Sequence, residues 1–374
     1  MTTTAPWRIA LSDVNLDEGE RAAVDDVLRG GWLSMGPVTE EFEAAFAERV
    51  PGHAVAVTNG TAALHLAAAA LGIEPGDEVI CPTLTFVATA AAMVQTGATV
   101  RLADSTSPDD FALDPREIER LVTPRTKAVA VVDYGGAPAD LDAIRDAATA
   151  HGVLVIEDAA HALGAELGGA PCGSLGDAGC FSFFPNKNLT TGEGGMVVFR
   201  DADVAARARL LRSHGMTALT WDRHRGHATG YDVVEFGFNY RLDEPRAALG
   251  LVQLSRLDEF NEARARLASR YAQNLEGSAF TVPSQGGRGR SSHHLVVVLA
   301  PSPAERDEAR ERLRERRIQT SVHYPLIHRF SRYRREGERL PVAEEIADRV
   351  ITLPLHPKMT HADVDEVCAA LRGA

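Results

Sequence analysis

The sequence predicts an α/β fold, in which a large and mostly parallel sheet carries helices on both faces and a smaller C-terminal α/β domain follows. Two observations lead to this prediction. Short β-rich runs alternate with helical patterns from residue 54 to residue 158, and beyond residue 245 the pattern changes to long amphipathic segments. Strands that alternate with helices of this length usually pair in parallel and are covered on both faces.

The first part of the chain has a regular order of elements. The runs AVAVT, EVICP, KAVAVVDY and VLVIED are expected strands, and TAALHLAAAALG, FVATAAAMVQTG and DLDAIRDAATAHG are the expected helices between them. Sheets of this kind bind ligands at the carboxyl ends of their strands. The segments that directly follow the runs, beginning at Asn59, Thr85, Asp133 and Asp158, are therefore candidate parts of a site.

The second part begins near Asp243. One continuous helical pattern runs from Asp243 to Leu275, with Asp243 as the expected N-cap and Pro245 in the first turn. A glycine-rich loop, an apolar strand HHLVVVLA and a charged helix PAERDEARERLRERR follow. We predict an N-terminal arm and large domain over residues 1–245, and a connecting helix and small domain over residues 246–374.

Composition excludes several classes of function. The 374 residues are 45% hydrophobic and 24% charged, with a formal net charge of −13, which argues against broad binding to nucleic acid or to an anionic membrane. No stretch reaches the roughly 18 apolar residues of a membrane span, and the first residues lack the features of a secretory signal. The four cysteines contain no C-x-x-C pair, so we expect packed free thiols in a cytoplasmic protein.

Lys187 is the residue that suggests a chemistry. It stands in FSFFPNKNLTTGEGG, residues 181–195, where an apolar run meets turn formers and glycines. A solvated loop lysine is the ordinary interpretation, and the glycines form neither a P-loop nor a dinucleotide-binding motif. A desolvated amine, however, can form a Schiff base with pyridoxal phosphate. That chemistry requires an acid for the ring nitrogen, donors for the phosphate and a face for the ring.

The chain offers candidates for the acid and for the phosphate donors. Asp158 ends the apolar run VLVIED, where a carboxylate could be held rigidly against the ring nitrogen. Gly60 and Thr61 open a helix in TNGTAALHLA, so their free amides and the helix dipole could face an anion, and Ser182 could add a hydroxyl. Each residue alone would be an ordinary cap, turn or strand serine, so only their combination favours the cofactor.

Two aromatic residues complete the set. Phe86 follows the run EVICP and could stack on the ring, and His161 follows Asp158 in DAAH and could hydrogen-bond the ring oxygen. A core aromatic and a structural histidine are the ordinary alternatives. The order in which all these residues occur is what favours a site for pyridoxal phosphate.

With these motifs in this order, the chain resembles the DegT-type (DegT/StrS) sugar aminotransferases, a family of fold type I pyridoxal phosphate-dependent transferases. The resemblance runs from about Ile9 to Leu371 and includes WLSMGPVTEEFEAAFA, TNGTAALHLA, GDEVICPTLTFVATA, VIEDAAHALGA, GFNYRLDEPRAALGLVQL, HYPL and LPLHP. It implies transfer of an amino group from glutamate to a keto sugar, in many relatives a nucleotide-linked keto-6-deoxyhexose, to make an amino sugar.

The resemblance also implies the cofactor contacts suggested above. Lys187 would form the Schiff base, Asp158 would pair with the pyridine nitrogen and His161 would lie by the ring oxygen. Asn239, in GFNYR, would reach the phosphate of a neighbouring subunit, so the expected assembly is a homodimer with shared sites. Dehydratase-like members carry histidine in place of the lysine, so the lysine here favours transamination.

Substrate contacts are predicted at two pairs of residues that match substrate-side positions of relatives: Ser34 and Gly36 in WLSMG, and His323 and Tyr324 in HYPL. In the loop TWDRHRGHATGYD, Arg223 and Arg225 could contact a nucleotide diphosphate, and a solvated loop is an equal alternative. An H-x-x-H spacing on such a loop does not predict a metal site.

Three other functions stay open at this point. Some relatives aminate cyclitol ketones with the same lysine, aspartate and phosphate group, and others are sugar dehydratases. A regulator that uses the fold to sense a ligand is the alternative without catalysis, because fold alone does not establish activity. A desulfurase would need a mobile reactive cysteine, whereas Cys368 lies in an amphipathic helical pattern.

Overall fold

A seven-stranded sheet lies at the centre of the computed structural model, which describes residues 7–218, 221, 225–226 and 229–373. Its strand order is β1 (His53–Val57), β11 (Gly195–Phe199), β10 (Ala178–Ser182), β7 (Leu154–Asp158), β6 (Thr126–Val132), β2 (Glu78–Pro82) and β3 (Thr99–Ala103). Only β11 runs antiparallel to its neighbours, β1 and β10. The predicted mostly parallel sheet is confirmed.

Helices cover both faces of this sheet because its strands are apolar on both sides. In β1, Val55 and Val57 pack into one core cluster with α3 (Gly60–Ala70), α4 (Val87–Gln95) and α7 (Ala202–Arg212). Ala54 and Ala56 face the opposite way, toward α2 (Pro37–Arg49). On that second face, α5 (Arg116–Leu121) and α6 (Leu141–Ala150) pack over β2, β6 and β7.

The predicted continuous helix after Asp243 is instead two helices, α9 (Glu244–Ser255) and α10 (Leu257–Leu275). Asp243 is the N-cap as predicted, accepting a hydrogen bond from the amide of Arg246. The helix breaks at Arg256, whose guanidinium bonds Glu20 at 2.9 Å. The break lets the two halves bury side chains in different places: Leu254 packs under the sheet, and Tyr271 packs in the C-terminal cluster.

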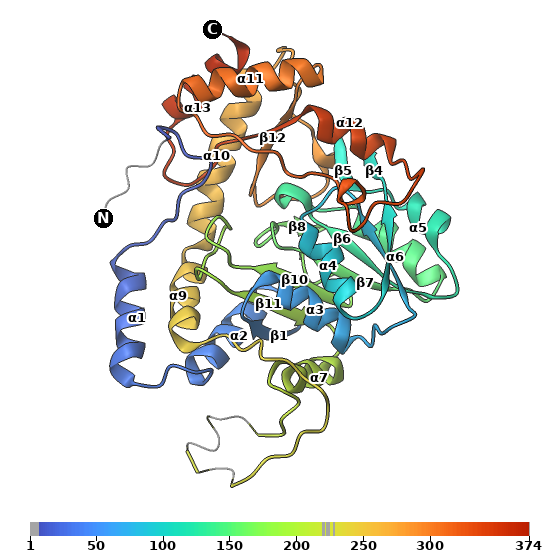
Figure 1. Ribbon diagram of the computed structural model, residues 1–374. Coiled ribbons are helices and arrows are strands. Elements are labelled where there is room, and N and C mark those ends of the chain that lie inside the picture. Colours follow the sequence, from blue (N-terminus) through green and yellow to red (C-terminus); the bar gives the residue numbers. More distant parts are fainter. Residues whose placement is uncertain (1–6, 219–220, 222–224, 227–228, 374) are drawn as a thin grey trace.

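The C-terminal part is built around a two-stranded antiparallel sheet of β12 (Val296–Leu299) and β13 (Val350–Leu353). Around it lie α11 (Pro303–Glu315), α12 (Pro341–Arg349) and α13 (His361–Arg372). Figure 1 shows α10 running from this part toward α9, which packs beside α1 (Glu18–Gly30). Ile9 is buried in the C-terminal cluster, so the N-terminal arm returns to that end. The domain boundary at residue 245 stays a prediction.

Short elements complete the fold. They are the hairpin of β4 (Ser105–Ser107) and β5 (Asp110–Leu113), the hairpin of β8 (Glu166–Leu167) and β9 (Ala170–Pro171), and the turns η1 (Tyr134–Gly136), η2 (Gln285–Gly287) and η3 (Ile327–Arg329). All four cysteines are buried and free, as predicted. Within the described chain, no helix combines the length and the apolar character needed to cross a bilayer.

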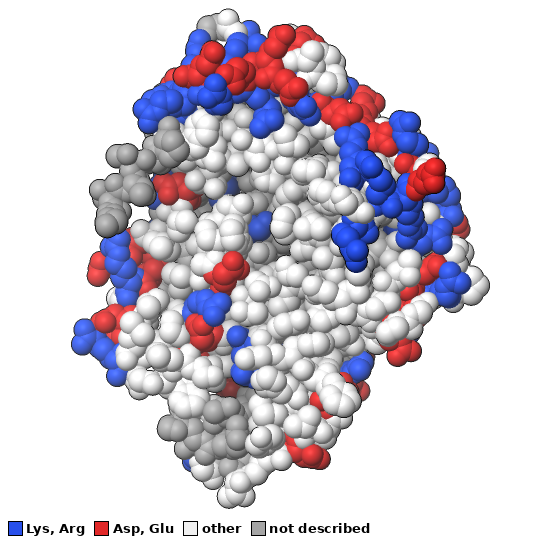
Figure 2. Space-filling model, viewed as in Figure 1, with Lys and Arg blue, Asp and Glu red and all other residues white. Residues whose placement is uncertain are grey.

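Charge is distributed unevenly over the surface. In Figure 2, blue and red atoms mix over the end of the molecule that carries α11 and α13, and the area around the centre is mostly white. Several arginines between residues 306 and 339 pair with acids, for example Arg329 with Asp348 at 2.7 Å and Arg339 with Glu344 at 2.7 Å. This pattern is typical of a solvated surface on which charges of both signs alternate.

Candidate active site

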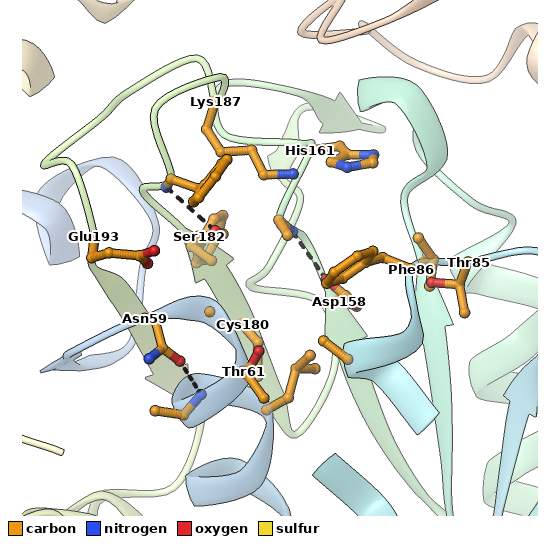
Figure 3. A pocket seen from close by; sticks show the side chains of 18 of the residues that line it. Asn59, Thr61, Thr85, Phe86, Asp158, His161, Cys180, Ser182, Lys187 and Glu193 are labelled. Carbon is orange, nitrogen blue, oxygen red and sulfur yellow. Dashed lines mark hydrogen bonds between the residues drawn. The ribbon is translucent and has the colours of Figure 1, made fainter. Parts of the chain in front are cut away.

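A cavity of about 600 Å³ lies at the carboxyl ends of β7 and β10, beside the N-terminus of α3. Such a position is typical of ligand sites in α/β proteins. Figure 3 shows that side chains from several segments converge there. The predicted site residues that line it are Gly60, Thr61, Phe86, Asp158, His161, Ser182, Lys187, His323 and Tyr324.

Lys187 extends from the turn after β10, and its amine points into the cavity toward His161 (Figure 3). Burial lowers the pKa of the amine to about 8, although the charge of Asp158 acts in the opposite direction. The neighbouring Asn188 fixes this turn, because its amide donates to the carbonyl of Ser292 and to Asn261 Oδ1, both at 2.8 Å. Lys187 is therefore held in a cavity with a partly neutral amine near neutral pH.

Asp158 is the last residue of β7 and is 6% exposed. Its Oδ2 accepts a hydrogen bond from Thr89 Oγ1 at 2.6 Å, and its Oδ1 accepts one from the Ala160 amide at 3.3 Å. Burial raises the pKa of the carboxyl, and these bonds together with Lys187 counteract the rise. No ion pair reaches Asp158 from the described residues, so the carboxylate faces the cavity with room for a cationic partner.

The opposite end of the cavity is suited to an anion. Asn59 caps α3 by accepting from the Ala62 amide at 2.8 Å, whereas the amides of Gly60 and Thr61 make no hydrogen bond within the described chain. A side chain at Gly60 would place its Cβ 2.7 Å from that of Ser182, so glycine is needed for the close approach of α3 to β10. Two free amides, a hydroxyl and the positive helix end thus gather at one place.

His161 lies between two other rings. Its Nε2 is 2.9 Å from Tyr324 Oη, and its Nδ1 accepts weakly from the Gly135 amide at 3.3 Å, which places the proton on Nε2. The ring of His294 lies 4.4 Å away, centroid to centroid. Burial, followed by the charges of Lys187 and His323, holds the pKa of His161 well below its usual value, so the ring stays neutral.

Phe86 and His323 lie farther along the cavity wall. Phe86 is 54% exposed, with its ring centroid 5.8 Å from that of Tyr324, so it offers an open aromatic face. His323 Nδ1 is 2.8 Å from Thr352 Oγ1, and burial followed by the charge of Lys187 lowers the pKa of His323 to about 4. Both histidines of the cavity are therefore neutral hydrogen-bonding groups at neutral pH.

Sequence reasoning missed several residues of the site. Glu193 and Tyr240 line the cavity, and Thr89 bonds Asp158 directly. Thr89 could have been found, because it lies one helical turn after the first residues that follow the EVICP run. His294, which lies against the ring of His161, could not, because nothing local in the sequence brings residues 133 apart together.

Other predicted residues lie outside the cavity of their own chain. Ser34 is exposed, and the Gly36 amide donates to Glu244 Oε1 at 2.9 Å at the start of α2. Asn239 is exposed in a segment that pairs with Ser213, although the next residue, Tyr240, lines the cavity. Glu244 is also bonded by Val38 and Thr39, so this corner is a structural junction.

The loop with the predicted diphosphate contacts is described only in part. Arg225 is exposed, with its guanidinium carbon 5.6 Å from the centroid of the Trp221 ring. Arg223 lies outside the described residues, as do His224 and His227 of the H-x-x-H spacing. Among the residues that are described, no group of three or more histidine, cysteine or acidic side chains could hold a metal ion.

The geometry can be tested against the cofactor that the sequence suggested. Pyridoxal phosphate carries an aldehyde, a ring nitrogen that can take a proton, and a phosphate. The cavity presents an amine of lowered pKa, a buried carboxylate that forms no ion pair with the described lysines and arginines, and helix N-terminal amides that no described residue bonds. The residues present therefore fit the group.

Comparisons with known proteins settle the family. A model of the DegT/DnrJ/EryC1/StrS aminotransferase family matches residues 14–372. The chain belongs to this family. It is 41% identical over 362 residues to the spore coat polysaccharide biosynthesis protein SpsC of Bacillus subtilis, covering 93% of this chain and 92% of that protein. It is also 41% identical over 371 residues to the GDP-perosamine synthase of Caulobacter vibrioides, covering 97% of each.

Solved structures agree with these matches. The aminotransferase TlmJ from Streptoalloteichus hindustanus superposes with a TM-score of 0.91 at 37% identity, over 98% of both chains. The Spr1654 protein of Streptococcus pneumoniae has a TM-score of 0.90 at 29% identity, again over 98% of both chains, and has been solved in PLP and PMP forms. The predicted fold, family, aminotransferase class and dependence on pyridoxal phosphate are thereby confirmed.

Proposed function

We propose that this enzyme transfers an amino group from glutamate to a keto sugar, and that this sugar is a nucleotide-linked keto-6-deoxyhexose. The observation that carries the proposal is the placement of the Lys187 amine and the Asp158 carboxylate in one cavity, next to an anion-binding helix end. The acceptor class is supported by the relatives, which include a GDP-perosamine synthase and a polysaccharide biosynthesis protein.

Each residue of the cavity has a proposed task. When bound, pyridoxal phosphate supplies an electron sink that makes the removal of a carbon-bound proton feasible. Lys187 Nζ would hold the cofactor covalently, and its free amine would accept and return the proton that moves during the reaction. A pKa of about 8 suits this exchange near neutral pH. Asp158, as a carboxylate, would pair with the ring nitrogen and keep it protonated.

The remaining residues bind and orient. The amides of Gly60 and Thr61, with the hydroxyl of Ser182, bind the phosphate, because they form the cluster of free donors in the cavity. Phe86 covers one face of the ring with its open aromatic surface. His161 Nε2 lies 2.9 Å from Tyr324 Oη, and as a neutral donor it would hydrogen-bond the ring oxygen.

The proposal includes a homodimer in the cytoplasm. Asn239 is exposed and outside its own cavity, which agrees with a role in the site of a neighbouring subunit. Nearby, Phe236 is 100% exposed and Val234 is 52% exposed, and apolar side chains of this kind are commonly covered in an assembly. Four reduced, buried thiols agree with a cytoplasmic protein.

A substrate panel tests the proposed function. Purified enzyme with pyridoxal phosphate and glutamate is offered nucleotide-linked 3-keto sugars, nucleotide-linked 4-keto sugars and a cyclitol ketone, and the release of 2-oxoglutarate is measured. We expect turnover of at least one nucleotide-linked sugar. Turnover of only the cyclitol would overturn the sugar acceptor while keeping the chemistry, and release of no 2-oxoglutarate with any acceptor would favour a ligand-sensing role.

A further inference from the structure

A pair of threonine hydroxyls lies behind the acid of the cavity. Thr89 stands in the first turn of α4 and is 0% exposed, and its Oγ1 donates to Asp158 Oδ2 at 2.6 Å. Thr85, which is 2% exposed, places its Oγ1 2.8 Å from Thr89 Oγ1. Three side chains are thus linked in a row that ends on the carboxylate.

The number of protons on the hydroxyls determines which group donates to which along this row. Each threonine hydroxyl has one proton to donate and two lone pairs to accept. Thr89 Oγ1 has two acceptors in reach, the Phe86 carbonyl at 3.2 Å and the carboxylate of Asp158 at 2.6 Å, and the ionised acceptor is both nearer and stronger. Thr89 therefore donates to Asp158, and Thr85 donates to Thr89.

We propose that Thr89 is a positioning residue for the enzyme's reaction: its hydroxyl, itself oriented by Thr85, holds the Asp158 carboxylate ionised and aimed at the ring nitrogen of pyridoxal phosphate. This inference rests on the proposed function of Asp158. It adds a role for two residues that do not themselves touch the reacting atoms.

The electrostatic surroundings explain why such a donor is needed. Asp158 is buried, no arginine or lysine of the described chain forms an ion pair with it, and burial raises the pKa of its carboxyl. The Thr89 hydroxyl is the strongest single influence in the opposite direction. The titratable groups that interact with Asp158 from the surrounding segments are Lys187, Tyr324, Cys81, Cys180 and Asp133.

The same threonine also connects the acid to the proposed stacking ring. Both the amide and the hydroxyl of Thr89 lie 3.2 Å from the Phe86 carbonyl, so the backbone of Phe86 is fixed by the residue that bonds Asp158. One turn of α4 therefore sets the relative position of the acid and the aromatic face. A valine has the shape of threonine and would keep the packing, but it would lose the hydroxyl.

The test compares Thr89→Val with Thr89→Ser. The association of pyridoxal phosphate with each apoprotein is measured by absorbance between pH 5 and pH 9. Since a hydrogen bond to a charged group is worth a factor of about ten or more, we expect Thr89→Val to bind the cofactor about tenfold more weakly at pH 7. Loss of the donor raises the pKa of Asp158, so binding should fail at a higher pH on the acid side. Thr89→Ser should restore both values to within about twofold of the wild type.

Two further variants act as references. Thr96→Val removes a hydroxyl at the other end of α4 whose one bond within the described chain is to the Met93 carbonyl, and it should leave cofactor association unchanged. Asp158→Asn measures the full contribution of the acid. If Thr89→Val does not yield folded protein, Thr89→Ala, which removes the hydroxyl without placing a methyl group beside the carboxylate, takes its place.

The outcomes distinguish a failure of the proposed role of Thr89 from a failure of the proposed role of Asp158. The role of Thr89 alone is overturned if Thr89→Val binds pyridoxal phosphate within twofold of wild type at every pH while Asp158→Asn binds it much more weakly. The same conclusion follows if Thr89→Ser binds the cofactor no more tightly than Thr89→Val. If Asp158→Asn binds the cofactor as tightly as wild type, the proposed role of Asp158 fails, and the inference about Thr89 fails with it.

Discussion

The floor of the cavity, formed by Asp158 and Lys187, and its rim, at Phe86, differ in how much of their side chains the rest of the chain buries. On the floor, Asp158 is 6% exposed and bonded by Thr89, and Lys187 stands on a turn fixed by the buried Asn188. Toward the rim, Phe86 is 54% exposed. The predicted substrate residue Arg225 is exposed and does not line the cavity. The core of the chain therefore fixes the geometry of the floor.

This difference teaches where cofactor chemistry and substrate choice are encoded. The cofactor groups extend from strand ends and from the first turns of helices that follow strands, so the packing of the sheet determines their positions. Of the residues predicted for substrate, Ser34 and Arg225 are exposed and do not line the cavity, whereas His323 and Tyr324 do. The following predictions test whether effects on cofactor and on substrate separate in the same way.

The largest effect is expected from Lys187→Ala. Loss of a residue that moves protons in the reaction lowers the rate by roughly 10²–10⁴-fold, and here the covalent attachment of the cofactor should disappear as well. The measurement is the release of 2-oxoglutarate from glutamate together with the absorbance of the bound cofactor. The chain has only two other lysines, Lys127 and the surface residue Lys358, and their alanine variants are matched controls that should keep activity.

The next largest effect is expected from Asp158→Asn. Replacing the carboxylate by a neutral amide removes a charge-assisted contact with the ring nitrogen, and we expect a loss of about 10–100-fold in turnover. The pH dependence of cofactor attachment provides a second measurement. The charge of Asp158 raises the pKa of Lys187, so its removal should lower that pKa further below about 8. Attachment of pyridoxal phosphate to the apoprotein should then begin at a lower pH, and an unchanged midpoint would contradict the coupling.

A smaller and more selective effect is expected from Arg225→Ala in the loop that lies outside the cavity. An exposed charged contact contributes about 0.2–1 kcal/mol, so the KM for a nucleotide-linked acceptor should rise by only about two- to fivefold. The glutamate half of the reaction should keep its kinetic constants. Steady-state kinetics with each substrate varied in turn checks this split. Equal effects on the glutamate half and the acceptor half of the reaction would indicate that Arg225 affects the cofactor and not the binding of the acceptor.

The smallest effect on activity is expected from Gly36→Ala. A Cβ at this position would lie 2.8 Å from Trp32 Nε1 and 3.3 Å from Glu244 Oε2, so the corner that begins α2 would have to shift. Overpacking of this kind typically costs about 1–3 kcal/mol of stability. Thermal unfolding should therefore detect the variant, and the KM values should stay near wild type. A selective rise in the acceptor KM without loss of stability would instead support the substrate contact predicted from the sequence.

The sequence was sufficient for the fold and for the floor of the cavity because both depend on local patterns. Alternating apolar runs and helical patterns determine a parallel sheet, and the ends of its strands necessarily gather at one edge. Asp158, Gly60 and Phe86 could therefore be selected by their place after a run. The same reasoning placed Ser182 and Lys187 together, since they flank the end of one strand.

The remaining features depend on contacts between distant segments, which no local pattern encodes. His294 reaches His161 from another part of the chain, and Glu244 bonds the amide of Gly36 across 208 residues. The break at Arg256 was also invisible, because neither proline nor glycine marks it. It arises where the helix leaves the core under the sheet for the C-terminal cluster, and where Arg256 pairs with Glu20.

The most direct test of the central claim is to locate the attached cofactor. Enzyme saturated with pyridoxal phosphate is reduced with borohydride and digested, and the modified peptide is identified by mass spectrometry. The account predicts one modified lysine per chain, Lys187, and no adduct in Lys187→Ala. Stable modification at Lys127 or Lys358 instead, or an adduct that persists at full yield in the variant, would contradict it.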